Sequence, residues 1–141
     1  MPCSRSFVDH ALDLLSALGP VRARAMFGGH GLYARGAMFA LLDDDELFLK
    51  TDAESRPRFL AAGCRRWTYA GMAETSWFRP PVEAHEVPEA MAPWAALALE
   101  AALRARAAKA AQAARSAARK AARPSTPDRQ PRAAPARRRS R

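Results

Sequence analysis

Apolar residues at helical spacing open the chain. The residues that fall on one stripe of a helix are Phe7, Ala11, Leu14, Leu15 and Leu18, with Val8 and Leu12 beside them. Ser6 and Asp9, three residues apart, resemble a capping box at the start of this stripe. Gly19-Pro20 stops the periodic pattern. The spacing therefore predicts a helix over residues 6–18.

Short apolar runs separated by turn residues come next. The runs cover residues 22–27, 30–34, 37–42 and 46–50. The turns between them are supplied by Gly28-Gly29, Arg35-Gly36 and Asp43-Asp44-Asp45. In the last run Leu47 and Leu49 are expected to point inward, and Phe48 outward. This pattern predicts an antiparallel meander.

The next part of the chain returns to helical spacing. Residues 51–62 predict a helix that starts at Asp52 or Ser55 and ends at Gly63. Two strand candidates follow, 66–69 and 75–79. A third helix is predicted to begin at or just before Pro93, because proline is accepted in a first helical turn. Its core-facing stripe consists of Trp94, Leu97, Ala98 and Ala101.

These elements predict a fold class. We expect a two-layer α+β domain with an antiparallel sheet, in the order helix, three strands, helix, two strands, helix. No run of 18 apolar residues occurs, so no membrane partner is expected. The start of the chain does not resemble a secretory signal, and Cys3 and Cys64 do not form a disulfide framework. A cytoplasmic protein with reduced thiols is the expectation.

Charge divides the chain near residue 103. Residues 1–103 carry 10 Lys+Arg and 13 Asp+Glu, a net charge of −3. Residues 104–141 carry 13 Lys+Arg and one acid, Asp128, a net charge of +12. After Leu103 alanine is the only apolar residue type. We therefore expect a domain over 1–103 and an Ala/Arg-rich basic arm over 104–141. Residues 104–122 favour partial helix, and disorder is expected from Pro124 onwards.

A basic arm without a core predicts a polyanionic partner. Codon bias in a GC-rich genome explains arginine over lysine, but it does not explain the missing acids between Glu100 and Asp128. Gln112 and Gln130 stand alone, so we expect sequence-independent, salt-sensitive binding to DNA or RNA. A solubilising tail is the alternative. The candidate nucleic-acid-binding residues are Arg104, Arg106, Lys109, Arg115, Arg119, Lys120, Arg123, Arg132, Arg137, Arg138 and Arg139.

Other groups of residues give weaker evidence for a functional site. Gly28-Gly29-His30-Gly31 runs into a strand, so it favours a structural turn over a phosphate-binding loop. The histidines, His10, His30 and His85, share no metal-ligand spacing with each other. An aromatic set could stack on nucleic-acid bases, although core packing is favoured: Trp67, Tyr69, Trp77 and Phe78. We expect no catalytic residue, no metal and no cofactor.

Several short motifs resemble a known family. They are Met26-Phe27-Gly28, Gly31-Leu32-Tyr33, the segment 36–41 and the segment 44–50. With these motifs, residues 7–103 resemble the N-terminal domain of the TfoX/Sxy family. The positions that carry the resemblance, and for which it implies a structural role, are Met26, Phe27, Gly28, Gly31, Tyr33, Gly36, Met38, Phe39, Leu47, Lys50, Phe59, Gly63 and Tyr69.

The resemblance implies a function class. It implies a bacterial, cytoplasmic, non-enzymatic protein related to regulators of natural competence, with a secretion-chaperone-like fold. The likeness weakens over residues 70–78, and the basic arm stands where competence regulators carry a helical second domain. The expected function is regulatory, with nucleic-acid binding through the arm. The alternative is a protein-interaction module with a transcription-factor partner or a second copy of itself.

Overall fold

The structure is a computed structural model that describes residues 3–26, 28–68 and 75–122. The chain divides between Ala107 and Ala108 into two units. Of the elements in the described residues, the larger unit contains all the strands and all the helices except the end of the last helix, α3 (Pro88–Ala122), which continues past the division. Phe27, residues 69–74 and residues 123–141 lie outside the described part.

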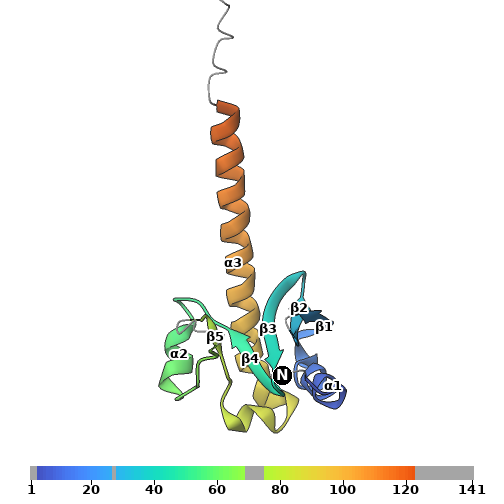
Figure 1. The fold of residues 1–141 in the computed structure, drawn as a ribbon. Helices are drawn as coiled ribbons and strands as arrows, with labels where there is room; N and C mark the ends of the chain where they lie inside the picture. The colour runs from blue at the N-terminus through green and yellow to red at the C-terminus, as the bar shows by residue number, and fades with distance from the viewer. Residues whose placement is uncertain (1–2, 27, 69–74, 123–141) are drawn as a thin grey trace, which may run out of the picture. The chain divides into compact units, whose positions relative to one another are not determined.

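An antiparallel sheet organises the larger unit (Figure 1). Its strands lie side by side in chain order: β1 (Arg22–Met26), β2 (Gly29–Ala34), β3 (Ala37–Asp43), β4 (Glu46–Lys50) and β5 (Trp77–Phe78). Beyond β5, Arg66 forms an isolated antiparallel bridge with Phe78. The predicted α+β class is confirmed, and four strands rather than three precede the second helix because each of the four apolar runs forms its own strand.

In the described part of the chain, three helices and two short 3-10 turns accompany the sheet. The helices are α1 (Arg5–Leu14), α2 (Arg56–Ala61) and α3, and the 3-10 turns cover Ser16–Leu18 and Val82–His85. Ser4 rather than Ser6 caps α1, because its side chain accepts a hydrogen bond of 3.2 Å from the Phe7 N–H. Of the two predicted starts for α2, Ser55 is the one that precedes the helix.

The predicted start of α3 was wrong. The helix begins at Pro88, whose fixed backbone angle suits the first helical position. The Ala90 and Met91 N–H groups both donate to the Val87 carbonyl oxygen and close the first turn. Pro93 therefore lies inside the helix instead of at its start, and one intrahelical hydrogen bond is missing there.

Two tight turns set the register of the central strands. Arg35 and Gly36 have φ angles of 52° and 75°, and Asp44 and Asp45 have φ angles of 50° and 56°. Two consecutive residues at positive φ define the turn whose twist matches that of an antiparallel hairpin. Because a slip by one residue would turn the apolar side chains to the opposite face, these turns also determine which side chains enter the core.

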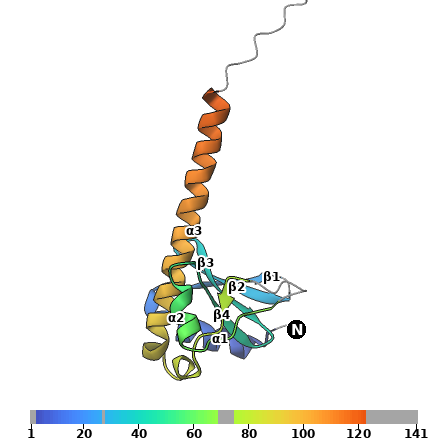
Figure 2. The same ribbon diagram turned by 90° about the vertical axis from the view of Figure 1, so that its left-hand side faces the viewer.

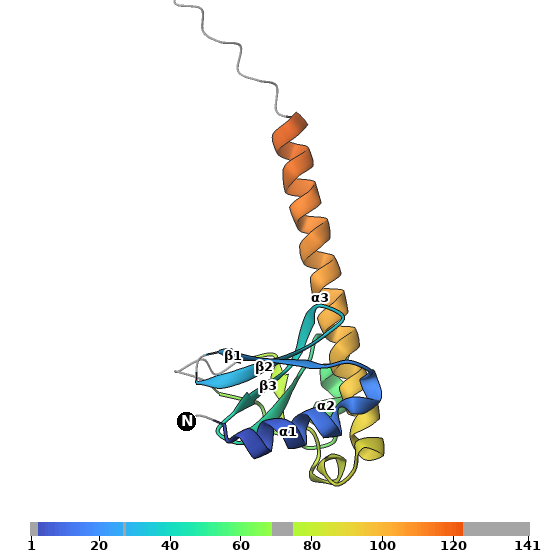
Figure 3. The same cartoon turned by 90° about the vertical axis from the view of Figure 1, so that its right-hand side faces the viewer.

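The core lies between the helices and one face of the sheet. A row of directly paired residues crosses this face from β2 to β5: Leu32, Ala40, Leu49 and Phe78. Phe59 of α2 packs against Phe78, with ring centroids 6.1 Å apart. Leu14 and Leu15 from the first helical segment and Ala95, Ala98 and Ala102 of α3 belong to the same cluster. Figure 3 shows α1 along the helix-covered face of the sheet.

Gly29 provides a test of the sheet geometry. A Cβ atom there would lie 2.1 Å from the Leu42 carbonyl oxygen, whereas a Cβ at Gly31 would meet only the flexible ends of Met26 and Met38, at 3.1–3.2 Å. We expect Gly29→Ala to lower the free energy of unfolding by about 3 kcal/mol, because β2 and β3 must move apart. Gly31→Ala, two residues away, should cost less than about 1 kcal/mol. Urea denaturation measures both, and equal losses would contradict the clash.

Candidate nucleic-acid interface

Four of the predicted cationic residues lie on the second part of α3. Lys109, Arg115, Arg119 and Lys120 are all exposed. None of them forms an ion pair with a carboxylate of the described residues. The side chains on this segment are Ala, Gln and Ser besides these cations, so it has no apolar stripe that could enter a core. These cations are consequently available to a partner.

Arg104 has a different environment. Its Nε donates to Asp52 Oδ2 over 2.7 Å, and its Nη2 donates to Asp52 Oδ1 over 3.1 Å. The Glu54 carboxylate lies 3.1 Å from the same Nε. A bidentate contact between a guanidinium and a carboxylate is a strong form of ion pair. Arg104 is thus neutralised within the larger unit.

Asp52 connects two elements through this contact. Its Oδ1 also accepts hydrogen bonds from the backbone N–H groups of Glu54 and Ser55, over 3.1 and 2.9 Å, at the turn that leads into α2. The hydrogen bonds from Arg104, followed by those from Ser55, hold the pKa of the Asp52 carboxyl well below its usual range. The carboxylate therefore stays charged and joins the start of α2 to α3.

Arg106 also contacts the larger unit. Its Nη1 donates to the Arg35 carbonyl oxygen over 2.6 Å, at the turn between β2 and β3. Together with Arg104, this contact extends the larger unit past Leu103, where the sequence suggested a border, and the division lies at Ala107–Ala108. The remaining predicted cations, Arg123, Arg132, Arg137, Arg138 and Arg139, lie outside the described residues.

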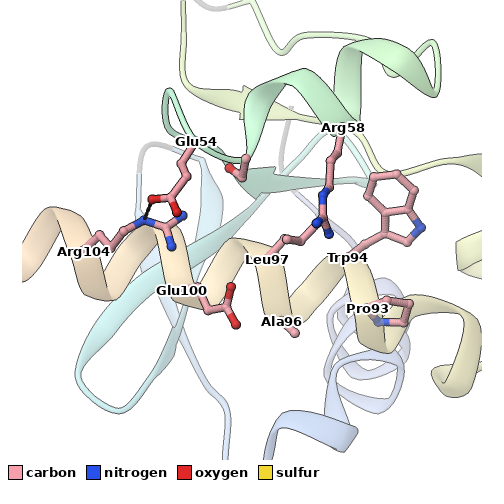
Figure 4. A pocket seen from close by; sticks show the side chains of 9 residues that line it. Glu54, Arg58, Pro93, Trp94, Ala96, Leu97, Glu100 and Arg104 are labelled. Atoms are coloured by element: carbon pink, nitrogen blue, oxygen red, sulfur yellow. Dashed lines mark ion pairs between the residues drawn. The ribbon is translucent and has the colours of Figure 1, made fainter.

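A groove lies between α2 and α3 (Figure 4). Figure 2 shows the ribbons of these two helices next to each other. Its volume is about 640 Å³, and Trp94 and Leu97 of α3 supply its apolar lining. Arg58 extends from α2 toward Trp94, while Glu100 and the Glu54–Arg104 pair lie along the rest of the groove. The lining thus alternates apolar and charged groups, which suits a polypeptide surface better than a small molecule.

The described residues of the aromatic set do not share one face of the sheet. Phe78 faces the helices and is fully buried, so it belongs to the core. Trp77 alternates to the other face, where Lys50 Nζ lies 5.0 Å from its ring centroid. The Trp67 indole Nε1 donates to Asp43 Oδ2 over 3.1 Å and its ring packs on Phe48 at 6.1 Å. Tyr69 lies outside the described residues.

Two of the aspartates considered for catalysis have partners within the domain. Asp43 accepts a hydrogen bond from Trp67, and Asp45 accepts one of 2.7 Å from the Ser4 N–H, so both have structural roles. Within residues 3–26, 28–68 and 75–122, no three His, Cys, Asp or Glu side chains are grouped as metal ligands would be. Burial raises the pKa of the Cys3 and Cys64 thiols, which disfavours the reactive thiolate form.

The positions that carry the family resemblance lie mostly in the core and turns. Leu47, Phe39 and Phe59 are buried, and Tyr33, Met38 and Lys50 are half-buried strand residues. Gly36 forms the β2–β3 turn, and Gly63, at a φ angle of 71°, follows α2. Met26 and Met38 converge on Gly31. Gly28 is exposed between β1 and β2, while Phe27 lies outside the described residues.

Comparison with known proteins now settles the family. A family model of the TfoX N-terminal domain matches residues 13–102, which span the strands, α2 and the buried part of α3. The chain belongs to the TfoX N-terminal domain family. The short motifs at β1 to β4 lie within the matched range.

One relative is similar to part of the chain. The chain is 37% identical over 61 residues to a protein named DNA transformation protein TfoX1, from Aliivibrio fischeri. The similar segment is 43% of this chain and 29% of the relative, so the chain matches less than a third of that protein's length.

In the described ranges, no helix combines the length and apolar character needed to cross a membrane.

The Asp52–Arg104 pair generates a pH-dependent prediction. A depressed carboxyl pKa adds stability above the pKa of the unfolded chain, near 4, and this stability is lost as the pH falls below it toward the folded value. Arg104→Gln should therefore lower the free energy of unfolding by about 1 kcal/mol at pH 7 and by less at pH 3. Denaturation at both pH values measures the difference.

Two controls accompany this variant. Arg119→Gln removes the same charge from an exposed position of α3 and should leave stability unchanged. In the Asp52→Asn background, Arg104→Gln should have only a residual effect through Glu54. A full additive loss in the double variant would show that the pair does not couple α2 to α3.

Proposed function

We propose that this protein is a non-enzymatic, cytoplasmic regulatory protein that associates with nucleic acid through the cationic residues from Lys109 onward. The observation that carries the proposal is the separation of charge: the larger unit pairs Arg104 with its own carboxylates, whereas the cations on the exposed part of α3 have none among the described residues. Positive side chains without intramolecular partners gain most from displacing the counterions of a polyanion.

The cations on the second part of α3 favour contact with the phosphate backbone of nucleic acid over recognition of a base sequence. Guanidinium and ammonium groups bind phosphate oxygens, but they fix a sequence only where side chains reach base edges in a groove. Between residues 108 and 122 the other polar side chains are Gln112 and Ser116. The name of the Aliivibrio fischeri relative refers to DNA transformation, and we extend a role in that process to this chain as part of the proposal.

Salt dependence tests the proposal. In the full chain, we expect the quadruple variant Lys109→Gln, Arg115→Gln, Arg119→Gln, Lys120→Gln to bind a duplex oligonucleotide more weakly than the unaltered chain. The slope of log K against log salt should fall by up to about 3.6, because each phosphate contact contributes about 0.9. Fluorescence anisotropy between 50 and 200 mM salt measures the affinity.

A charge-retaining variant serves as the control. Arg115→Lys with Arg119→Lys keeps the charge and helix propensity, so its salt slope should equal that of the unaltered chain. Equal slopes for the quadruple variant and the unaltered chain would reject binding through this segment.

The α2–α3 groove supports a second candidate function, protein binding. Its Trp94 and Leu97 side chains offer an apolar centre with charges at the margin, as protein interfaces do. We expect Glu100→Lys to abolish capture of a transcription factor or of a second copy in nuclease-treated extract, and Glu86→Lys, also exposed, to leave it intact. Equal capture by both variants, or none by the unaltered chain, would reject the groove.

A further inference from the structure

A second cationic surface lies on the sheet, and it shares no lining residue with the groove between α2 and α3. A cavity of about 550 Å³ opens beside β1 and the β2–β3 turn. Three arginines line it, Arg22 and Arg24 from β1 and Arg35 from the turn, together with Tyr33 of β2. None of the described residues that line this cavity is acidic. We call these four residues the β1 patch.

The strand register places these side chains together. Arg22 pairs directly with Tyr33, and Arg24 pairs with Gly31, two residues before Tyr33. Residues two apart on a strand point to the same face, about 7 Å apart. Arg22, Arg24 and Tyr33 therefore share one face of the sheet, and all three line the cavity. Arg22 and Arg24 are exposed, and Tyr33 is half-buried.

Three other arginines of the larger unit are paired with carboxylates. Arg65 and Arg79 bind the Glu46 carboxylate, and Arg104 binds Asp52. By contrast, Arg22, Arg24 and Arg35 form no ion pair within the described ranges. An uncompensated cluster of like charge has a repulsive energy, which an anionic ligand would remove.

Backbone geometry adds an independent observation. Arg35 has a φ angle of 52°, in the left-handed region where a turn of this type normally carries Asn, Asp or Gly. The equivalent turn between β3 and β4 does carry Asp44 and Asp45. An arginine in such a strained position indicates a use for its side chain. Arg106, bound to the Arg35 carbonyl oxygen, adds a fourth guanidinium next to this turn.

We propose that the β1 patch binds a single-stranded nucleic acid, with Arg22 and Arg24 on consecutive phosphates and a base stacked on Tyr33. Guanidinium groups suit phosphate oxygens, and an aromatic ring in a basic groove suits an unpaired base. The inference takes its class of partner from the proposed function, but its contacts lie in residues 1–107. Duplex nucleic acid, with its bases stacked inside, cannot use Tyr33 in this way.

The test measures binding of labelled oligo(dT) by the full chain. Arg22→Gln and Arg24→Gln should each lower the salt slope by about 0.7, the value per phosphate contact on a single strand, and the double variant by about 1.4. The double variant leaves the edge strand without its two arginines and could aggregate. Each single variant keeps one arginine on that strand, so the measurement can be made on the single variants alone. Arg5→Gln, an exposed charge on α1, is the matched control and should leave the slope unchanged.

Tyr33 tests the base contact. Tyr33→Leu should weaken oligo(dT) binding about five-fold or more without changing the salt slope, whereas Tyr33→Phe should retain binding. If Tyr33→Leu binds as tightly as Tyr33→Phe, the single-strand assignment is overturned. If Arg22→Gln and Arg24→Gln behave like Arg5→Gln, the patch itself is overturned.

The Lys109–Lys120 quadruple variant separates this inference from the proposed function. Loss of oligo(dT) binding in the quadruple variant but not in the patch variants would reject the β1 patch and leave the proposed function standing. Loss of oligo(dT) binding in the patch variants but not in the quadruple variant would support the β1 patch and reject binding through Lys109–Lys120. Patch-dependent binding to anionic lipid vesicles without binding to oligo(dT) would reject the nucleic-acid partner.

Discussion

Burial of one face of the sheet against an alanine-rich face of α3 is the interaction on which the rest of the domain depends. Met91, Ala95, Ala98 and Ala102 lie on that face, and all are buried. Alanine lets a helix approach a sheet closely, so the larger side chains of the sheet and of α2 fill the remaining space. Each methyl group removed from water adds to the hydrophobic stabilisation. The Arg104–Asp52 and Arg106–Arg35 contacts then join α3 to the turn before α2 and to the β2–β3 turn.

The same residue type has opposite roles along one helix. Ala95, Ala98 and Ala102 belong to the core, whereas every alanine from 105 to 122 is exposed. The change coincides with the two arginines that close the larger unit, Arg104 on Asp52 and Arg106 on the Arg35 carbonyl oxygen. Polar contacts therefore take over from apolar packing at the end of the domain. Beyond them α3 continues through the intrinsic helix propensity of Ala, Arg and Lys.

Sequence patterns predicted those parts of the fold that depend on neighbours along the chain. The alternation in residues 46–50 and the turn residues at 35–36 and 44–45 fixed the hairpins, because strand period and turn geometry are local properties. The outward direction of Phe48 was also correct, yet this side chain is buried because Trp67 packs on it. Pro93 misled the prediction for α3, since a proline inside a helix looks like one at its start.

Contacts between distant residues could not be predicted in the same way. Asp52 and Arg104 are 52 positions apart, and no spacing rule links them. Two members of the candidate cationic set consequently proved to be engaged within the larger unit. The alternating Arg22-Ala23-Arg24 of β1 did offer a visible signal, because charged residues at period two mark one face of a strand.

The position of β1 has one more consequence. Within the described residues this strand pairs only with β2, so among them its outer row of N–H and C=O groups has no partner strand. Such a row can template the addition of a foreign strand, and charged side chains are a common safeguard against it. Arg22 and Arg24 therefore also act as gatekeepers of solubility. A chain without both arginines would have an uncharged edge strand, and copies of it could then aggregate by edge-to-edge strand pairing.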